Sequence, residues 1–191
     1  MKKFGVGGAL GDIGTHAENI VEYITGLQFK EIAADLGRFG EGRVLDDDGN
    51  ILLRLENGAK GTMSFSQIAT GEENNLAIKV YGEKGSLEWC QENPNQLITR
   101  WLDKSKTIFT SNGNNLYKEA IAASRIPAGH SEGYLEAFAN IYKNFARHLN
   151  TKLANQNIEN LDYPTVSDGV WKVIKLNNIT LKNLFCFWGI R

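Results

Sequence analysis

The sequence is poor in the residues that mark disulfide-stabilised or nucleic-acid-binding proteins. It has 2 cysteines and 3 prolines in 191 residues, and its 21 basic side chains nearly balance 22 acidic ones. Cys90 and Cys186 lie far apart, outside any CxxC or Cys/His cluster, so we expect reduced thiols rather than a disulfide or a zinc site. Neither charge sign forms a long block, which argues against nucleic acid as a partner.

Long apolar runs are also absent from the sequence. No run approaches the roughly 18 residues of a membrane span, and residues 1–8 hold no apolar stretch long enough for a signal peptide. We therefore expect a cytoplasmic protein with no membrane partner. What is present is a hydrophobic content of 42%, enough for one core in a chain within the usual domain range of about 50–250 residues.

Hydrophobic periodicity predicts two helices on either side of a β-rich middle. From 11 to 25 the apolar residues recur at helical spacing, and Gly26 follows where a left-handed C-terminal cap is favoured. The second helix is predicted over 132–149, with Ser131 as its N-cap. Its buried stripe is expected to comprise Tyr134, Phe138, Ile141, Phe145 and Leu149.

Short β-rich runs separated by turn signals fill the middle of the chain, which favours antiparallel pairing. The expected strands are 51–55, 61–67, 76–81 and 86–90. Met63 and Phe65 alternate with small hydroxyl residues, so the large side chains are predicted on a packed face. The hydroxyls on the other face are Thr62, Ser64 and Ser66. The expected fold class is α+β: a mainly antiparallel, open-faced sheet of about six or seven strands with helices packed on one face.

Asp12 and His16 are the first candidates for chemistry. They stand four residues apart on the first predicted helix, so their side chains share a face beside the apolar stripe. A carboxylate near an imidazole can fix its tautomer and leave the other ring nitrogen free to take a proton from a hydroxyl. An exposed surface pair has the same spacing and remains the alternative. Gly14 stands inside a helical turn where alanine is more stable by about 1 kcal/mol, which indicates a close approach to that backbone.

The segment Gly7–His16, with Gly-Gly and then Asp-x-Gly-x-His, is similar to the catalytic signature of the Gfo/Idh/MocA oxidoreductase family. Further similar stretches, in the expected order, are 45–48, 54–61, 64–75, 80–89 and 127–134. The resemblance extends from 7 to 168 and implies the family's substrate-binding, catalytic C-terminal domain over 1–170, of the glyceraldehyde-3-phosphate dehydrogenase-like kind. It leaves 171–191 as an atypical, apolar C-terminal tail.

The resemblance also implies an activity and its cofactor. The family's enzymes are dehydrogenases that oxidise a CH–OH group of a sugar or a polyol such as inositol, with NAD or NADP. His16 matches the proposed proton acceptor from the substrate hydroxyl, and Asp12 matches the aspartate that assists it or contacts the substrate. The sequence contains neither a G-x-G-x-x-G unit between strand and helix nor a Glu-Lys-Pro motif. We therefore expect a truncated form that is inactive alone, unless a separate nucleotide-binding chain completes it.

Four further polar residues are candidate substrate contacts: Gln67, Asn74, Asn75 and His130. Side-chain amides both donate and accept hydrogen bonds, as polyol recognition requires, although turn and strand-edge roles remain open for each. His130 directly precedes the second predicted helix, where unpaired amides can orient a polar group. The resemblance makes it a substrate contact, and a role in capping or in packing beneath the sheet is the alternative. We expect Asp12 and His16 to share one shallow cleft with Asn74 and His130.

Three consecutive carboxylates suggest a metal site at first sight. Asp46, Asp47 and Asp48 have no His or Glu at ligand spacing, and consecutive side chains of a strand and turn point in different directions. We therefore expect a solvated turn and no metal.

Two functions of different classes follow from this sequence. The first is the substrate-binding, catalytic domain described above, and the alternative is a non-catalytic oligomerisation or carbohydrate-binding module. For either function, helices on one face of the sheet leave the other face uncovered. A large apolar patch on that face would be unfavourable in a monomer, because it would be exposed to water. We therefore expect a homo-oligomer that buries this open face. The aromatic residues expected at or near the contact are Phe185, Phe187 and Trp188.

Overall fold

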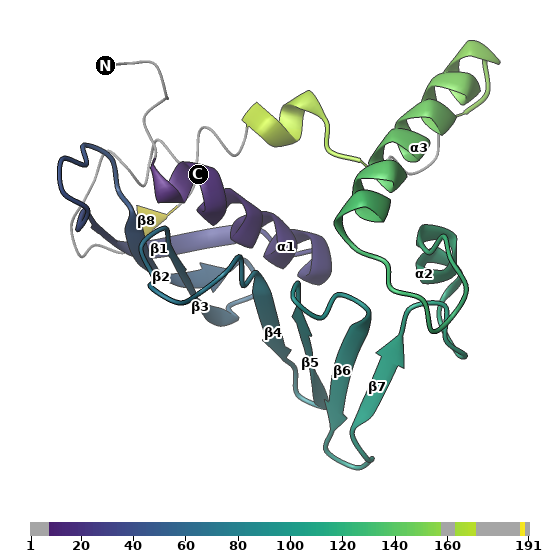
Figure 1. Cartoon of the computed structure of the whole chain (residues 1–191), viewed down its shortest axis with the longest axis horizontal. Helices are drawn as coiled ribbons and strands as arrows, with labels where there is room; N and C mark the ends of the chain where they lie inside the picture. Colours follow the sequence, from purple (N-terminus) through teal and green to yellow (C-terminus); the bar gives the residue numbers. More distant parts are fainter. Residues whose placement is uncertain (1–7, 158–162, 171–187, 190–191) are drawn as a thin grey trace. The chain divides into compact units, whose positions relative to one another are not determined.

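The computed structural model describes residues 8–157, 163–170 and 188–189 of the chain. The chain divides into two compact units, Met1–Glu72 with Val166–Arg191 and Glu73–Thr165. Each unit contains one four-stranded antiparallel sheet (Figure 1). The predicted α+β class with mainly antiparallel strands is confirmed, but the strands form two sheets where we expected a single one of about six or seven strands.

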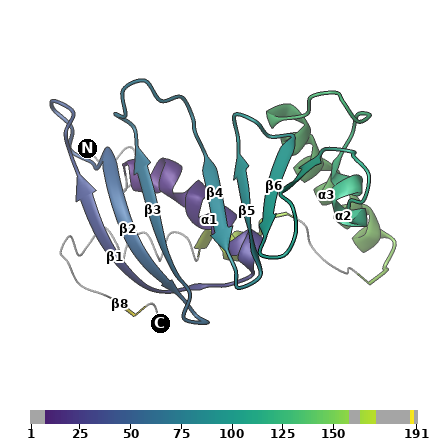
Figure 2. The same ribbon diagram turned by 90° about the horizontal axis from the view of Figure 1, so that it is seen from below.

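The first unit begins with a helix in two parts. A π-helical turn, η1 (Leu10–Gly14), runs directly into α1 (Thr15–Thr25). The strands of this unit are β1 (Phe29–Gly37), β2 (Asp48–Leu55), β3 (Lys60–Ser66) and β8 (Trp188–Gly189). They pair in the order β3-β2-β1-β8. The helix lies against one face of β1–β3, as Figure 2 shows.

The core of the first unit lies between that helix and the sheet. Burial alternates along β2, where Ile51 and Leu53 are buried and Leu52 between them is 54% exposed. The same alternation along β3 buries Met63 and Phe65, as predicted, and leaves the hydroxyl residues on the other face. The remaining buried members of the core are Ala9, Leu10, Phe29, Ile32 and Leu55. Each fully buried large side chain stabilises the fold by about 1.5–3 kcal/mol, which fixes the helix over this face.

Two glycines explain how the first helix ends and how it approaches the sheet. Gly26 adopts φ 69° and its N–H donates to the carbonyl of Glu22 at 2.9 Å, the left-handed cap that was predicted. Gly14 is buried, and a Cβ at this position would lie 2.9 Å from Cδ1 of Leu10 and 3.5 Å from the ring of Phe65. The close approach expected at Gly14 is therefore the packing of the helix on β3.

The second unit is a meander followed by two helices. Its strands are β4 (Ala77–Tyr81), β5 (Gly85–Cys90), β6 (Gln96–Trp101) and β7 (Thr107–Thr110). They pair in sequence order, each with the next, because short turns join them. The helices are α2 (Lys118–Ala123) and α3 (Tyr134–Leu153).

The long helix α3 differs from its prediction in two respects. Its N-cap is Gly133 rather than Ser131, and the carboxylate of Glu136 accepts the N–H of Gly133 at 2.8 Å. None of its residues is buried: the stripe predicted as buried is exposed by between 41% (Ile141) and 70% (Tyr134). Periodicity identifies an apolar helix face, but it carries no information on which element covers that face.

The remaining expectations concern the membrane and the C-terminal tail. None of the helices within the described ranges is long and apolar enough to cross a membrane. Phe185 and Phe187 lie outside the described residues, and of Trp188 only the backbone, paired with Ile32, is described. The proposed role of these aromatics in a subunit contact stays a prediction.

Candidate functional site

Two of the predicted site residues meet in the first unit. Asp12, in the π-helical turn, accepts a hydrogen bond at its Oδ2 from Nε2 of Gln67, at 2.9 Å. Gln67 follows directly after β3, and both side chains are exposed. Fifty-five positions separate the two residues in sequence, so the fold and not the local spacing creates this contact. π-Helical turns occur often at functional sites, which fits the position of Asp12.

His16 lies four residues after Asp12, in the first turn of α1, and is exposed. Within the described residues, the hydrogen-bond partner of the Asp12 carboxylate is Gln67 rather than His16. The candidate groups on and beside this helix are thus an amide and a carboxylate in contact, and an imidazole one helical turn further along. Such groups can together bind a hydroxyl and accept its proton.

Asp46 holds the start of this helix. Its carboxylate accepts the N–H of Gly8 at 2.8 Å and that of Leu10 at 2.7 Å, while its carbonyl accepts the N–H of Ala9, also at 2.8 Å. Asp46 is 7% exposed. Helix-start amides prefer an anionic partner, and here that partner is a side chain of the same chain.

Asp47 does the same for a different segment. Its side chain is fully buried, and the two carboxylate oxygens accept the N–H groups of Phe39 at 2.9 Å and Gly40 at 2.8 Å. These two backbone hydrogen bonds hold the pKa of the Asp47 carboxyl below its usual value. The expectation of a solvated turn was therefore wrong for Asp46 and Asp47, because each satisfies two backbone donors that would otherwise be unpaired.

Asn74 and Asn75 lie in the second unit, in the exposed segment before β4. Asn75 has a left-handed backbone with φ 44°, and its N–H donates to the carboxylate of Glu92. Cys90 donates its Sγ–H to the same carboxylate at 3.0 Å, which raises the pKa of the thiol and lowers that of Glu92. Asn75 thus has a turn role as well as its proposed role as a substrate contact.

His130 also lies in the second unit, on an exposed turn in which its N–H and Nδ1 each lie 3.2 Å from the carbonyl oxygen of Pro127. Glu132 organises this turn: one carboxylate oxygen accepts the N–H groups of Arg125 and Ile126, each at 2.7 Å. The side chain of Asn95 bonds the backbone of Glu132 on both sides. Sequence reasoning missed Glu132 and Asn95, because 37 residues separate them and no spacing rule links such a pair. A cleft shared by His130, Asn74, Asp12 and His16 stays a prediction.

The start of η1 is the glycine-rich helix start of the first unit. A dinucleotide pyrophosphate binds at a glycine-rich helix start through free amides, but at the glycine-rich start of η1 the amides of Gly8 and Leu10 are taken by Asp46. A second anion there would meet a carboxylate, so this helix start does not fit a nucleotide. No group of three His, Cys, Asp or Glu side chains that could hold a metal ion occurs among the described residues.

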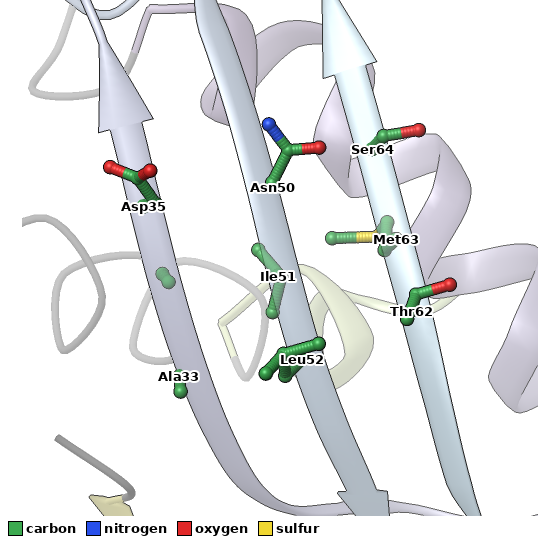
Figure 3. A pocket seen from close by; sticks show the side chains of 9 residues that line it. Ala33, Asp35, Asn50, Ile51, Leu52, Thr62, Met63 and Ser64 are labelled. Atoms are coloured by element: carbon green, nitrogen blue, oxygen red, sulfur yellow. The ribbon is translucent and has the colours of Figure 1, made fainter. Parts of the chain in front are cut away.

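A separate hollow of about 380 Å³ lies on the open face of the first sheet, opposite α1. Figure 3 shows Asp35, Asn50 and Ser64 in a row across β1, β2 and β3, with Leu52 and Thr62 further along the same face. Asp35 pairs with Asn50, and Asn50 with Ser64, in the strand register. This face therefore has a polar end and an apolar end.

Comparison with known proteins finds oxidoreductases. The sequence model of the family described as "GFO/IDH/MocA C-terminal domain" matches residues 2–88. The chain is 33% identical over 165 residues to an uncharacterized oxidoreductase, YfiI, of Bacillus subtilis (strain 168), with 84% of this chain and 42% of that protein covered.

Solved structures of similar proteins cover nearly the whole chain. An oxidoreductase from Sinorhizobium meliloti is 40% identical, with a TM-score of 0.88, over 96% of this chain and 52% of that one. An inositol dehydrogenase homolog from Azotobacter vinelandii, in complex with NADH and myo-inositol, is 28% identical, with a TM-score of 0.87, over 97% of this chain and 51% of that one. The chain spans about half the length of these relatives.

Proposed function

The chain belongs to the Gfo/Idh/MocA oxidoreductase family, within its C-terminal domain, and on that premise we propose that it supplies the substrate-binding side of an NAD(P)-dependent sugar or polyol dehydrogenase. The observation that carries the proposal is the hydrogen bond between Asp12 and Gln67, with His16 one helical turn further on. These three side chains offer a donor, an acceptor and a proton acceptor on one exposed surface.

Each of the three residues has a distinct role in this proposal. The imidazole of His16 takes the proton of the substrate hydroxyl as that carbon is oxidised. The Asp12 carboxylate accepts a hydrogen bond from the same or an adjacent hydroxyl, and the Gln67 amide keeps the carboxylate in that orientation. Asn74, Asn75 and His130 are proposed to contact the remaining hydroxyls of the substrate.

Hydride acceptance belongs to the nicotinamide nucleotide, and the start of η1, whose Gly8 and Leu10 amides are taken by Asp46, does not fit its pyrophosphate. We therefore propose that the 191-residue chain binds the polyol but neither binds NAD(H) nor turns over by itself. Titration with NADH, followed by nucleotide fluorescence, is expected to show no saturable binding up to about 1 mM, well above ordinary nucleotide affinities. Saturable binding in the micromolar range would contradict this part of the proposal.

The substrate role is tested by isothermal titration of the chain with myo-inositol and with D-glucose. His16→Ala removes one neutral hydrogen bond and Asp12→Asn a charge-assisted one, and each is expected to weaken binding of the preferred ligand about tenfold. Asn19→Ala, an exposed change on the next turn of α1, is the matched control and is expected to leave the affinity unchanged. Equal affinity of the wild type and His16→Ala for every ligand that binds would contradict the assignment.

A second proposal concerns assembly, and it would serve either a dehydrogenase domain or a non-catalytic binding module. We infer that a second copy of the chain covers the open face of β1–β3. Leu52 is 54% exposed there, and its neighbours Ala33, Thr62 and Ser64 are small enough for close approach. Burial of such a face removes apolar surface from water, which stabilises association by about 25 cal/mol per Å².

Light scattering at tens of micromolar is expected to give a dimer or a higher oligomer, because a specific interface of standard size is stable in that range. Ser64→Arg would place a large charged side chain on this face and is expected to yield monomers. Asn57→Arg, on the exposed turn after β2, is the matched control. A monomeric wild type would contradict the proposal.

A further inference from the structure

The two residues directly before β2, Asp46 and Asp47, connect the two halves of the Asp12–Gln67 contact. Asp46 accepts two amides of the segment that leads into Asp12, and its carbonyl accepts a third. Asp47, the next residue, donates its own N–H to Gly37 at 3.1 Å, and its carbonyl accepts the N–H of Gln67 at 2.8 Å. The backbones that carry Asp12 and Gln67 are thus hydrogen-bonded to adjacent residues.

The two carboxylates make these attachments rigid. Both side chains are buried, and each accepts two backbone N–H groups at 2.7–2.9 Å. Hydrogen bonds to an ionised acceptor are about twice as strong as neutral ones. Asp48, by contrast, is half-buried and starts the regular pairing of β2 with β1 and β3. The three acidic residues therefore divide into two that connect distant segments and one that is an ordinary strand residue.

We propose that Asp46 and Asp47 are positioning residues of the substrate site: they set the distance between the Asp12 carboxylate and the Gln67 amide, and through it the orientation of Asp12. The inference rests on the proposed function for its effect on the substrate, but its structural part concerns this chain alone. In a merely structural role the two carboxylates would close their loops without any effect on the Gln67 side chain. The two roles therefore predict different behaviour of the Gln67 side chain when Asp46 is substituted.

Asp46→Asn is the informative substitution because it conserves shape. One of its two terminal atoms becomes an NH₂ group facing a backbone N–H of Gly8 or Leu10, so one hydrogen bond is replaced by two opposed donors. We expect the helix start to move and the Asp12–Gln67 hydrogen bond to break. The side-chain NH₂ signals of Gln67 in a ¹H–¹⁵N correlation spectrum report this directly, and Gln67→Glu assigns them by their disappearance.

The expected result is a shift of the Gln67 NH₂ signals in Asp46→Asn to the positions they take in Asp12→Ala, where their acceptor is missing. Asp48→Asn is the matched control and should leave them in place. Gly8→Ala tests the same connection if Asp46→Asn does not fold, since its Cβ would come within 1.9 Å of the Asp46 carbonyl oxygen. Unchanged Gln67 signals in whichever of these two variants keeps the wild-type circular dichroism would overturn the proposal.

Polyol binding then separates positioning from stability. Asp46→Asn is expected to weaken binding of the preferred polyol about tenfold in the wild-type background and less than about twofold in a Gln67→Ala background, a coupling of the size found within one hydrogen-bond network. Equal losses in both backgrounds would contradict the positioning role. If the wild type binds no polyol, the proposed function fails, and the Gln67 signals alone decide whether Asp46 positions Asp12.

Discussion

The two units of the chain use similar sheets in different ways. In the first unit, one face of β1–β3 is packed against η1 and α1, and the hydrophobic core consists of residues from that unit. In the second unit, the six residues of β5 are all half-buried, Ile78 is the buried apolar residue of its sheet, and α3 buries none of its residues. A strand-like sequence pattern is thus enough to form a paired antiparallel sheet in either unit. A hydrophobic core also requires a helix or another element that covers one face of the sheet. The catalytic candidates Asp12 and His16 lie on the unit that has one.

The largest expected effect lies in the core of the first unit. Ile51→Ala, at 2% exposure, is expected to lower the free energy of unfolding by about 2–5 kcal/mol, because it removes buried methyl groups and leaves a cavity. Its neighbour Leu52 points to the open face, and Leu52→Ala is expected to change stability by less than about 1 kcal/mol. Urea denaturation of both variants measures the difference. Equal losses would contradict the one-sided packing of this sheet.

A smaller effect is expected where the helix meets the sheet. Gly14→Ala would bring a methyl group within 2.9 Å of the buried Leu10 side chain. Overpacking of this kind costs about 1–3 kcal/mol, which exceeds the gain of about 1 kcal/mol in helix propensity. Gly11→Ala has open space around its Cβ. It gains helix propensity without overpacking and is therefore expected to be stabilising. Thermal unfolding of the two variants should therefore shift in opposite directions, and shifts of the same sign would count against the packing described.

The third comparison is between a backbone-bound carboxylate and an ion-paired one. The folded-state pKa of Asp47 lies below its ordinary value of 3.8, first through the hydrogen bond from Phe39 and then through that from Gly40. Its stabilising contribution is therefore complete above about pH 4 and is lost as the pH falls through the folded-state pKa. Asp47→Asn is expected to reduce stability at pH 7, with the difference from wild type shrinking in acid.

Glu88 provides the contrast in the second unit. Its pKa is lowered by hydrogen bonds from Arg100 and then Lys79, at 2.7 and 3.2 Å. These partners are half-exposed, so about 0.5 M NaCl is expected to weaken the effect of Glu88→Gln by screening. The effect of Asp47→Asn should persist in the same salt, because its partners are backbone amides around a buried group. Denaturation at two salt concentrations checks this, and equal salt sensitivity would contradict the distinction.

The smallest effect is expected on α3. Ile141 is 41% exposed, so Ile141→Ala removes little area from the interior and is expected to cost less than about 1 kcal/mol. The same substitution at Ile51 costs several times more, which makes these two variants a matched pair. A loss at Ile141 as large as that at Ile51 would show that α3 is covered in solution. Urea denaturation under one set of conditions decides between the two outcomes.

Local sequence patterns predicted much of the secondary structure and identified the candidate site residues. The alternation of Met63 and Phe65 with hydroxyl residues, the cap at Gly26 and the helical spacing of Asp12 and His16 each depend on residues within one or two turns of each other. Gln67 was also among the predicted site residues, on the chemistry of its amide. Such features follow from backbone geometry and from the period of the side chains, so a sequence is enough to find them.

What the tertiary structure decided depends on segments that are distant in sequence. Asp46 and Asp47 were predicted as a solvated turn, yet they are buried, because strand pairing brings unpaired amides of residues 8–10 and 39–40 to them. Gln67 meets Asp12 because the fold places the end of β3 beside the helix start. The spacing of the apolar residues predicted the apolar stripe of α3, but it did not predict that this stripe is exposed. The sequence by itself determined which faces are apolar and which side chains are candidates for chemistry. The tertiary structure decided their partners, since a buried polar group must find a donor or acceptor wherever the folded chain provides one.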